Sequence, residues 1–320
     1  MAKFNEYPVK TKPADTDTFL TYDTSGKSNK QVTMQSIAET ILSRMSHNIP
    51  RLAPKDITSY YNDGSLWKRL NGTGGYSLFE DIYVGDYFKM SRAISAPNPD
   101  ASLQLTGSQY VTIAGIDSLY GNGDSNPVTY HHLVMVPGQG FGGTQHFGRS
   151  RMNPTNTTVG GYKGSEMNTT VIGEVATAGS TAAGATINQQ LFAEFGSHLK
   201  TTRELVSNSL NASGYNQFGA ATGCMNSWEW GSYQAILMSE IELYGSIVFS
   251  SSAYDIGTAN HQFELFVHSK QAINNRSAWY YLKGAASASH FCLCGSIGNA
   301  DYSDASYASG YVRPRFVIGA

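Results

Sequence analysis

The sequence predicts an α+β protein in which a small module of strands and a helix precedes a large domain of strands and long loops. Charged residues make up only 14% of the 320 residues, against roughly 25% in an average soluble domain. In their place stand 33 Gly and 20 Tyr. Because long exposed helices are rich in Glu, Lys, Arg and Ala, this composition favours strands and loops. The hydrophobic pattern also changes near residue 47, from a helical stripe to short strand-like segments.

Charge and hydropathy argue against several classes of partner. The 22 Lys and Arg nearly balance the 24 Asp and Glu, which gives a formal net charge of −2. We therefore expect no electrostatic capture of nucleic acid or of an anionic membrane. No stretch reaches the roughly 18 consecutive apolar residues of a membrane span, and the first residues lack the apolar core of a secretory signal. Three cysteines are too few for a disulfide framework, so folding in a reducing cytoplasm is expected.

The first 47 residues predict a small module. Residues 18–23 and 31–34 are typical of two short strands. Behind them, apolar residues recur at helical spacing: Ile37, Ile41, Leu42 and Met45. A module with a single apolar stripe cannot build its own core, so we expect the stripe to be buried against another chain or another protein. Residues 1–47 are therefore predicted to serve attachment or oligomerisation.

Residues 48–80 are predicted to be a connecting region bracketed by Pro and Gly, with a possible helix over 56–70. Residues 81–320 predict the large domain, and one helix is expected there over 187–208. Its other apolar segments are typical of short strands: 82–90, 110–114, 132–136, 236–244, 263–267, 279–283, 290–294 and 312–318. Long loops separate them, and such loops usually carry function.

Histidine and cysteine patterns do not predict a metal site. Three histidines, His131, His132 and His146, could be ligands, but adjacent strand residues point to opposite faces, so His131 and His132 cannot easily share one ion. No Asp, Glu or Cys stands at ligand spacing nearby. Cys292 and Cys294 share one strand face, where buried thiols are usually small hydrophobes. We expect structural roles for all five residues, and no metal or cofactor.

The sequence carries no motif for covalent catalysis, since it lacks a Gly-x-Ser-x-Gly elbow. Glu240 and Glu242 share one face of a predicted strand and could form the acid/base pair of a glycan hydrolase. The alternative is that one of them pairs with Arg313, a cation in the otherwise apolar last strand. Because buried charges are usually paired, we favour a structural ion pair between Glu240 and Arg313. The expected protein is not an enzyme.

The segment 279–311 has the composition of a recognition surface. Tyr alternates there with Ser, Asn, Asp and Gly, as in antibody paratopes. The alternative is a polar loop whose tyrosines lie half in the core. Strand alternation over 279–283 directs Leu282 and Tyr280 to the core, and Tyr281 and Lys283 outward. The predicted binding residues are Tyr281, Lys283, Ser287, His290, Asn299, Asp301, Tyr302 and Tyr307.

Separated motifs fall in order along residues 81–320: GDYFK (85–89), YHHLVMVP (130–137), MNPTNTTVGGY (152–162), GSEM (164–167), LMSEIELYG (237–245), WYYLK (279–283) and GYVRPRF (310–316). Together they resemble an uncharacterised domain that is common in gut-bacteriophage fibre and receptor-binding proteins. The resemblance implies a C-type-lectin-like fold of the kind shared with the formylglycine-generating enzyme. The motifs of calcium-dependent lectins do not occur, so carbohydrate recognition through calcium is not expected.

The N-terminal residues, with DTDTFLTYD at 15–23, are similar to the virion-anchoring ends of phage fibre proteins, which are typically trimeric. The resemblance implies a homotrimer in the virion, joined to other virion proteins through residues 1–47. The expected partner of residues 81–320 is a bacterial surface glycan or protein, which makes this a tail or head fibre that binds a host receptor. Two alternatives stay open: a glycan-degrading enzyme of the virion and a purely structural capsid decoration protein.

Overall fold

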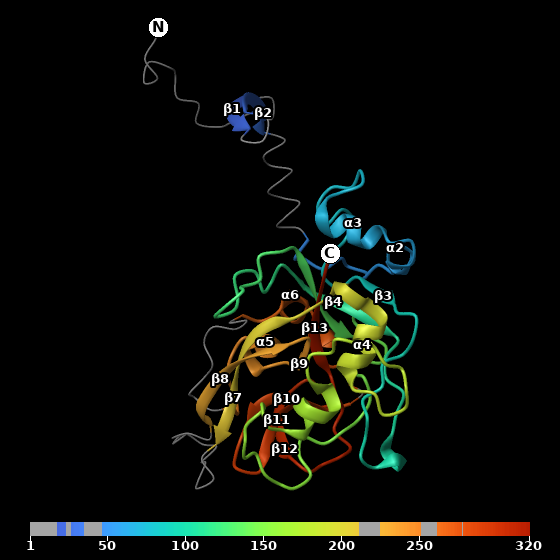
Figure 1. Ribbon diagram of the computed structural model, residues 1–320, viewed down its shortest axis with the longest axis vertical. Coiled ribbons are helices and arrows are strands. Elements are labelled where there is room, and N and C mark those ends of the chain that lie inside the picture. The colour runs from blue at the N-terminus through green and yellow to red at the C-terminus, as the bar shows by residue number, and fades with distance from the viewer. Residues whose placement is uncertain (1–17, 24–26, 35–46, 211–224, 251–260, 277) are drawn as a thin grey trace. The chain divides into compact units, whose positions relative to one another are not determined.

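The computed structural model describes residues 18–23, 27–34, 47–210, 225–250, 261–276 and 278–320 (Figure 1). The chain divides into two compact units, Met1–His47 and Asn48–Ala320. Within them the fold is mixed α+β, with mostly antiparallel sheets and short helices. This confirms the predicted fold class at that level. None of the described helices is long and apolar enough to cross a membrane.

The described part of the first unit is a β-hairpin. Strand β1 (Thr18–Asp23) pairs antiparallel with β2 (Ser28–Thr33), so that Thr18 lies opposite Thr33 and Asp23 opposite Ser28. The two short strands that the sequence predicts are thus present. The helix predicted from the apolar stripe over 37–45 lies outside the described residues.

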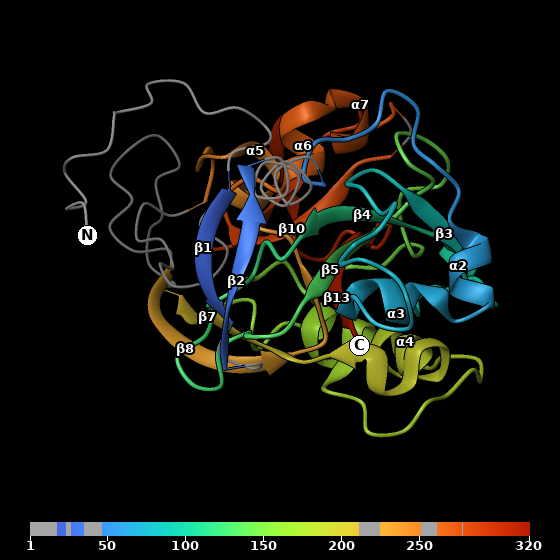
Figure 2. The same cartoon turned by 90° about the horizontal axis from the view of Figure 1, so that it is seen from above.

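The large unit is built around an antiparallel sheet in the order β3-β4-β5-β13-β6, with β9 also paired to β13. Its strands are β3 (Tyr87–Lys89), β4 (Tyr110–Ile116), β5 (His132–Pro137), β6 (Leu199–Lys200), β9 (Ala235–Leu237) and β13 (Pro314–Gly319). All six residues of β5 and of β13 are buried. In Figure 2, α6 and α7 lie on one side of this sheet and α4 on the other. The C-terminal strand is therefore a central element of the core.

Short helices cover the sheet: α2 (Thr58–Asn62), α3 (Ser65–Asn71), α4 (Ile187–Phe195), α5 (Glu240–Tyr244), α6 (Glu264–His268) and α7 (Lys270–Ile273). Three further turns of helix are η2 (Ala101–Leu103), the π-helix η3 (Met167–Gly173) and η4 (Gly196–His198). Ile57, Leu66 and Leu70 around α2 and α3 are wholly buried in the main core. Residues 48–80, predicted to be a connecting region, thus belong to the large unit.

The helix predicted over 187–208 is shorter than expected. It begins with a capping box, in which the Thr186 hydroxyl accepts the Gln189 N–H and Gln189 bonds back to Thr186. It ends at Phe195 because Gly196 adopts φ 54°, a left-handed value that favours glycine. The apolar residues beyond it, which fit the helical spacing, instead lie in β6 and in β7 (Thr202–Leu210).

Two segments predicted as strands are helical. Residues 236–244 divide into β9 and α5, because Ser239 caps the helix and forms a capping box with Glu242. Glu240 and Glu242 therefore lie on a helix turn rather than on one strand face. The strand predicted over 263–267 is likewise replaced by α6, which begins directly after Phe263.

The remaining strands form a hairpin and a small sheet. Strand β7 pairs with β8 (Met225–Tyr233), and β10 (Tyr280–Ala285), β11 (His290–Cys294) and β12 (Ala300–Asp304) form a three-stranded antiparallel sheet. The predicted strands over 279–283 and 290–294 are confirmed. The sequence did not predict β12, because its residues Ala-Asp-Tyr-Ser-Asp carry no apolar alternation and none of them is buried.

Candidate functional site

The candidate site is an open hollow beside β10, β11 and β12. This sheet lies at the end of the large unit opposite its C-terminus and α3 (Figure 1). The hollow has a volume of about 470 Å³ and is lined by Trp279, Leu293, Gly295, Ser296, Ile297, Asn299, Asp301, Tyr302, Ser303 and Tyr307. Four of the predicted binding residues are therefore brought together: Asn299, Asp301, Tyr302 and Tyr307.

Aromatic rings form one wall of the hollow. The rings of Trp279 and Tyr307 have centroids 6.0 Å apart at 47°, and Tyr281 packs edge-on beneath Trp279 at 5.1 Å. The Tyr307 side chain is 55% exposed. Because tyrosine has an apolar face and a polar tip, an exposed, supported Tyr suits ligand contact.

Tyr302 and polar groups complete the lining. Tyr302 stands edge-on to Phe249, with centroids 5.3 Å apart, and to His290, at 5.4 Å. Asp301 is exposed and accepts the backbone N–H of Tyr302 at 2.9 Å. Asn299 is also exposed. Aromatic faces, a carboxylate and an amide thus border one space.

Ser287 and His290 lie outside the hollow, behind Tyr302. The imidazole Nδ1 of His290 contacts the hydroxyls of Ser287 and Ser289, both at 2.8 Å, and Nε2 contacts the Asp304 carboxylate at 2.8 Å. The Ser287 hydroxyl also accepts the N–H groups of Ser289 and His290, at 3.3 and 3.1 Å. These bonds fix the turn between β10 and β11, so the Ser-His-Asp chain is explained as a structural support of Tyr302.

Tyr281 and Lys283 were predicted to point outward, and this prediction is wrong. Tyr281 is 0% and Lys283 5% exposed. The Tyr281 hydroxyl donates to the carbonyls of Asp304, at 2.6 Å, and Tyr307, at 3.2 Å. The alternation argument assumes that one strand face meets water, whereas both faces of β10 are covered and all six of its residues are buried. Burial accordingly raises the pKa of Tyr281.

The predicted ion pair between Glu240 and Arg313 is also wrong. Arg313 is buried, as expected, but its guanidinium donates to the Ile273 carbonyl at 2.7 Å and to the Tyr280 hydroxyl at 3.1 Å. Glu240 instead accepts backbone N–H groups at 2.9–3.1 Å, from Val248, Phe249 and Ser250. Because α5 is helical, Glu240 and Glu242 point in different directions.

The buried ion pairs of this region involve Arg315. Its guanidinium contacts Glu242 at 3.0 Å and Glu204 at 2.8 Å, and all three side chains are at most 2% exposed. Burial opposes ionisation of Glu242, but Arg315 and Lys283 outweigh it and lower the pKa of this carboxyl. The triad joins β7, α5 and β13, so Glu242, one of the two carboxylates considered for hydrolysis, is used to hold the core.

The histidine and cysteine predictions can be compared with the described residues. There, no three His, Cys, Asp or Glu side chains stand where they could hold a metal ion. His132 is wholly buried and accepts the Leu119 N–H at 3.1 Å, which is a structural role. Burial lowers the pKa of His146 to about 4. Cys292 and Cys294 are buried free thiols.

A second hollow, of about 360 Å³, lies between η3 and β8 and is lined by Lys163, Asn168, Thr169, Gly173, Glu174, Val175, Gly231, Ser232 and Tyr233. The Lys163 ammonium is paired with Glu229 at 2.5 Å. The aromatic residue that lines this second hollow, Tyr233, is 8% exposed, so the hollow offers little aromatic surface to a ligand.

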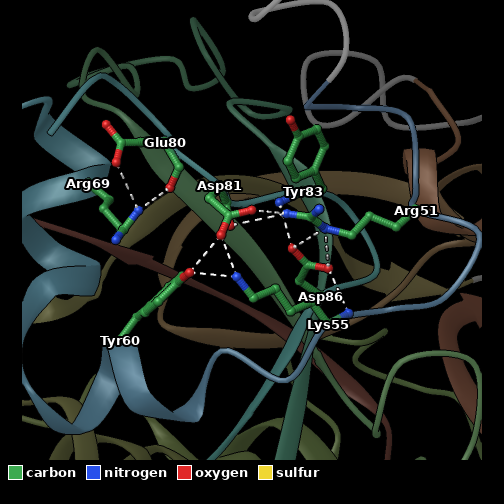
Figure 3. Close-up of polar contacts among 8 residues, drawn as sticks. All are labelled: Arg51, Lys55, Tyr60, Arg69, Glu80, Asp81, Tyr83 and Asp86. Atoms are coloured by element: carbon green, nitrogen blue, oxygen red, sulfur yellow. Dashed lines mark hydrogen bonds and ion pairs between the residues drawn. The ribbon is translucent and has the colours of Figure 1, made fainter.

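A dense polar cluster fastens the start of the large unit (Figure 3). Asp81 accepts bonds from Arg51, Lys55 and the Tyr60 hydroxyl, the last at 2.6 Å. Asp86, whose side chain is wholly buried, accepts the N–H of Lys55 at 2.9 Å and lies 3.3 Å from Arg51. Hydrogen bonds from Lys55, Tyr60 and Arg51 outweigh burial and lower the pKa of Asp81. Every charge has a partner here, so we interpret the cluster as a structural clamp.

No protein-family model, no curated protein and no solved structure matches the chain. The phage resemblance of the sequence motifs therefore stays a prediction. Sequence reasoning also missed part of the hollow: Trp279, Leu293, Ser296, Ile297 and Ser303. A signal for Ser303 was available, because it lies two residues from Asp301 and thus on the same face of a strand. That signal applies only once residues 300–304 are recognised as a strand.

Proposed function

We propose that the protein is a structural component of a bacteriophage virion, a tail or head fibre, which binds a receptor on the host surface through the hollow beside β10–β12. The observation that carries this proposal is the convergence of Asn299, Asp301, Tyr302 and Tyr307 on one open space. Tyrosine is one of the residue types enriched among the hot spots that dominate binding energy.

The organisation of the chain supports the proposal. A C-type-lectin-like fold, which the sequence motifs suggest, is compatible with antiparallel sheets joined by long loops. Residues 1–47 form a unit of their own, as an attachment module to other virion proteins would. Assembly as a homotrimer would present three copies of the hollow, and such multivalency raises the avidity of a weak site.

Within the described part of the chain, neither alternative has an observation in its favour. A glycan-degrading enzyme would need two carboxylates free to act on a substrate, whereas Glu240 and Glu242 are at most 1% exposed and bonded to backbone or Arg315. A purely structural decoration protein would have no use for an exposed Tyr307 packed beside the half-buried Trp279.

The test is attachment to cells. Full-length fluorescent protein is mixed with a panel of gut bacterial strains and bound protein is measured by flow cytometry. Tyr302→Ala combined with Tyr307→Ala should reduce binding about tenfold or more, because a hot-spot residue contributes roughly 2 kcal/mol. Tyr120→Ala is the matched control, since Tyr120 is 59% exposed and does not line the hollow. Unchanged binding of the double variant would place the receptor site elsewhere.

A further inference from the structure

We infer that the hollow beside β10–β12 selects a neutral, hydroxyl-rich saccharide and rejects anionic glycans. The inference rests on the proposed function and adds the chemical class of the receptor. It is carried by three features of the lining: the aromatic wall, the sign of its charge and the rigidity of its rim.

The aromatic wall fits a sugar ring. Trp279, Tyr302 and Tyr307 all line the hollow, and the first and last of these rings support each other at 6.0 Å. The negative face of an aromatic ring attracts the polarised C–H groups on one face of a pyranose. A volume of about 470 Å³ also lies within the roughly 300–1,000 Å³ of small-ligand sites.

The charge of the lining excludes anionic ligands. Among the described residues that line the hollow, Asp301 is the charged one, and the others offer the hydroxyls of Ser296 and Ser303 and the amide of Asn299. Sites for phosphate or carboxylate use Arg or Lys to form charge-assisted hydrogen bonds. Here Asp301 would repel such a group, while its carboxylate oxygens can accept two sugar hydroxyls. Neutral saccharides match this set of donors and acceptors.

A protein receptor fits less well. Protein interfaces contain a dry apolar centre ringed by polar residues. At this hollow the large exposed apolar side chains are Ile297, 72% exposed, and Tyr307, and they border an open polar space rather than form a continuous patch. The lining is therefore closer to that of a small-ligand site than to the centre of an interface.

The rim is held before any ligand arrives. The Gly295 N–H donates to the Asn299 carbonyl at 2.7 Å and the Gly298 N–H to the Gly295 carbonyl at 2.9 Å. Asn274 donates to the Gly295 carbonyl at 2.9 Å from the core side. On the other side, Asp301 is paired with Leu293 across the sheet. A fixed rim reduces the ordering cost of binding a small ligand.

Chemical treatment of cells tests the class of receptor. Cells of a strain that binds the full-length protein are treated with periodate, which cleaves vicinal diols, or with proteinase K. We expect periodate to reduce binding at least tenfold and proteinase K to leave it within twofold. Loss after proteinase K with survival after periodate would identify a protein receptor and overturn the inference. The Tyr307 dependence of binding would survive that result, so the proposed function would stand.

A glycan array tests the charge selectivity. The full-length protein is applied to printed bacterial glycans, both neutral and carrying uronic acids or phosphates. Wild-type signal should be at least tenfold higher on neutral glycans. Asp301→Asn keeps the size and part of the hydrogen bonding, and should raise the ratio of acidic to neutral signal at least fivefold, whereas Ser232→Ala in the second hollow should leave that ratio unchanged. Preferential binding of wild type to acidic glycans, or an unchanged ratio in Asp301→Asn, would overturn the inference.

Discussion

The rings of Trp279 and Tyr307 lie 6.0 Å apart between centroids and are tilted by 47°, although one residue precedes β10 and the other follows β12. The contact is positioned by Tyr281, whose hydroxyl donates to the Tyr307 carbonyl at 3.2 Å while its ring packs edge-on against Trp279. A buried tyrosine that was expected to touch the receptor thus holds the two residues that line the hollow.

Replacing Gly310 with Ala should disturb this arrangement. A Cβ at Gly310 would contact the Tyr281 ring and lie 2.8 Å from the Trp279 ring, so both aromatic side chains must shift. We expect Gly310→Ala to lower the free energy of unfolding by roughly 1–3 kcal/mol, as overpacking does, and to weaken cell binding as well. Gly75→Ala is a control for the loss of a glycine, because nothing lies within 4 Å of its added Cβ, although its φ of 89° adds local strain. Equal stability of Gly310→Ala and wild type would contradict the packing described.

Replacing Arg315 with Met should strongly destabilise the large unit. The change leaves Glu204 and Glu242 buried without their cation, and breaking a buried pair costs about 3–5 kcal/mol. Urea denaturation measures the effect. Adding Glu204→Gln and Glu242→Gln to Arg315→Met should recover part of the lost stability, because these changes remove the two uncompensated charges. A cost below about 1 kcal/mol for Arg315→Met would show that the triad does not matter for stability.

Acid should weaken the clamp around Asp81. Its pKa is lowered in the folded protein, since the bonds from Lys55, Tyr60 and Arg51 outweigh burial. The stabilisation is therefore present above the unfolded Asp pKa of about 3.9 and is lost as the pH falls through the lower folded value. We expect Asp81→Asn to cost about 1 kcal/mol at pH 7, a modest figure because solvent screens this partly exposed side chain. The difference from wild type should shrink below about pH 4. A difference that grows on acidification would reverse the assigned sign.

Removing residues 1–47 should leave the large unit folded. The two units are separately compact, and the core of the second contains no described residue of the first. The truncated protein should keep a cooperative thermal transition within a few degrees of the full chain and still bind cells, with lower avidity if the removed part holds a trimer together. Unfolding of the truncated chain would show that residues 1–47 are needed for the large unit to fold.

The core strands were predictable from sequence because they are continuous apolar runs. Segments 110–114, 132–136 and 312–318 are buried on both faces, so composition alone identifies them. Local signals that compete with periodicity were missed. The capping box at Ser239 ended a strand and began α5, and Gly196 ended α4 where the helical spacing continued.

The candidate site was predictable in composition but not in orientation. Asn299, Asp301, Tyr302 and Tyr307 follow one another in a short polar stretch, so their gathering is largely local. The burial of Tyr281 and Lys283 depends on which elements cover β10, and no pattern within 279–283 reports that. One of the two partners of Arg315, Glu204, likewise lies in β7, a strand whose sequence has the spacing of a helix.

Hydrogen exchange offers the most direct test of receptor binding through the hollow beside β10–β12. The amides of full-length protein are compared with and without an excess of cell-surface extract from a strain that it binds. The account predicts slower exchange in residues 295–307 and around Trp279, and no such protection in the Tyr307→Ala variant. Protection confined to other segments, such as those around Lys163 and Ser232 in the second hollow, would contradict it.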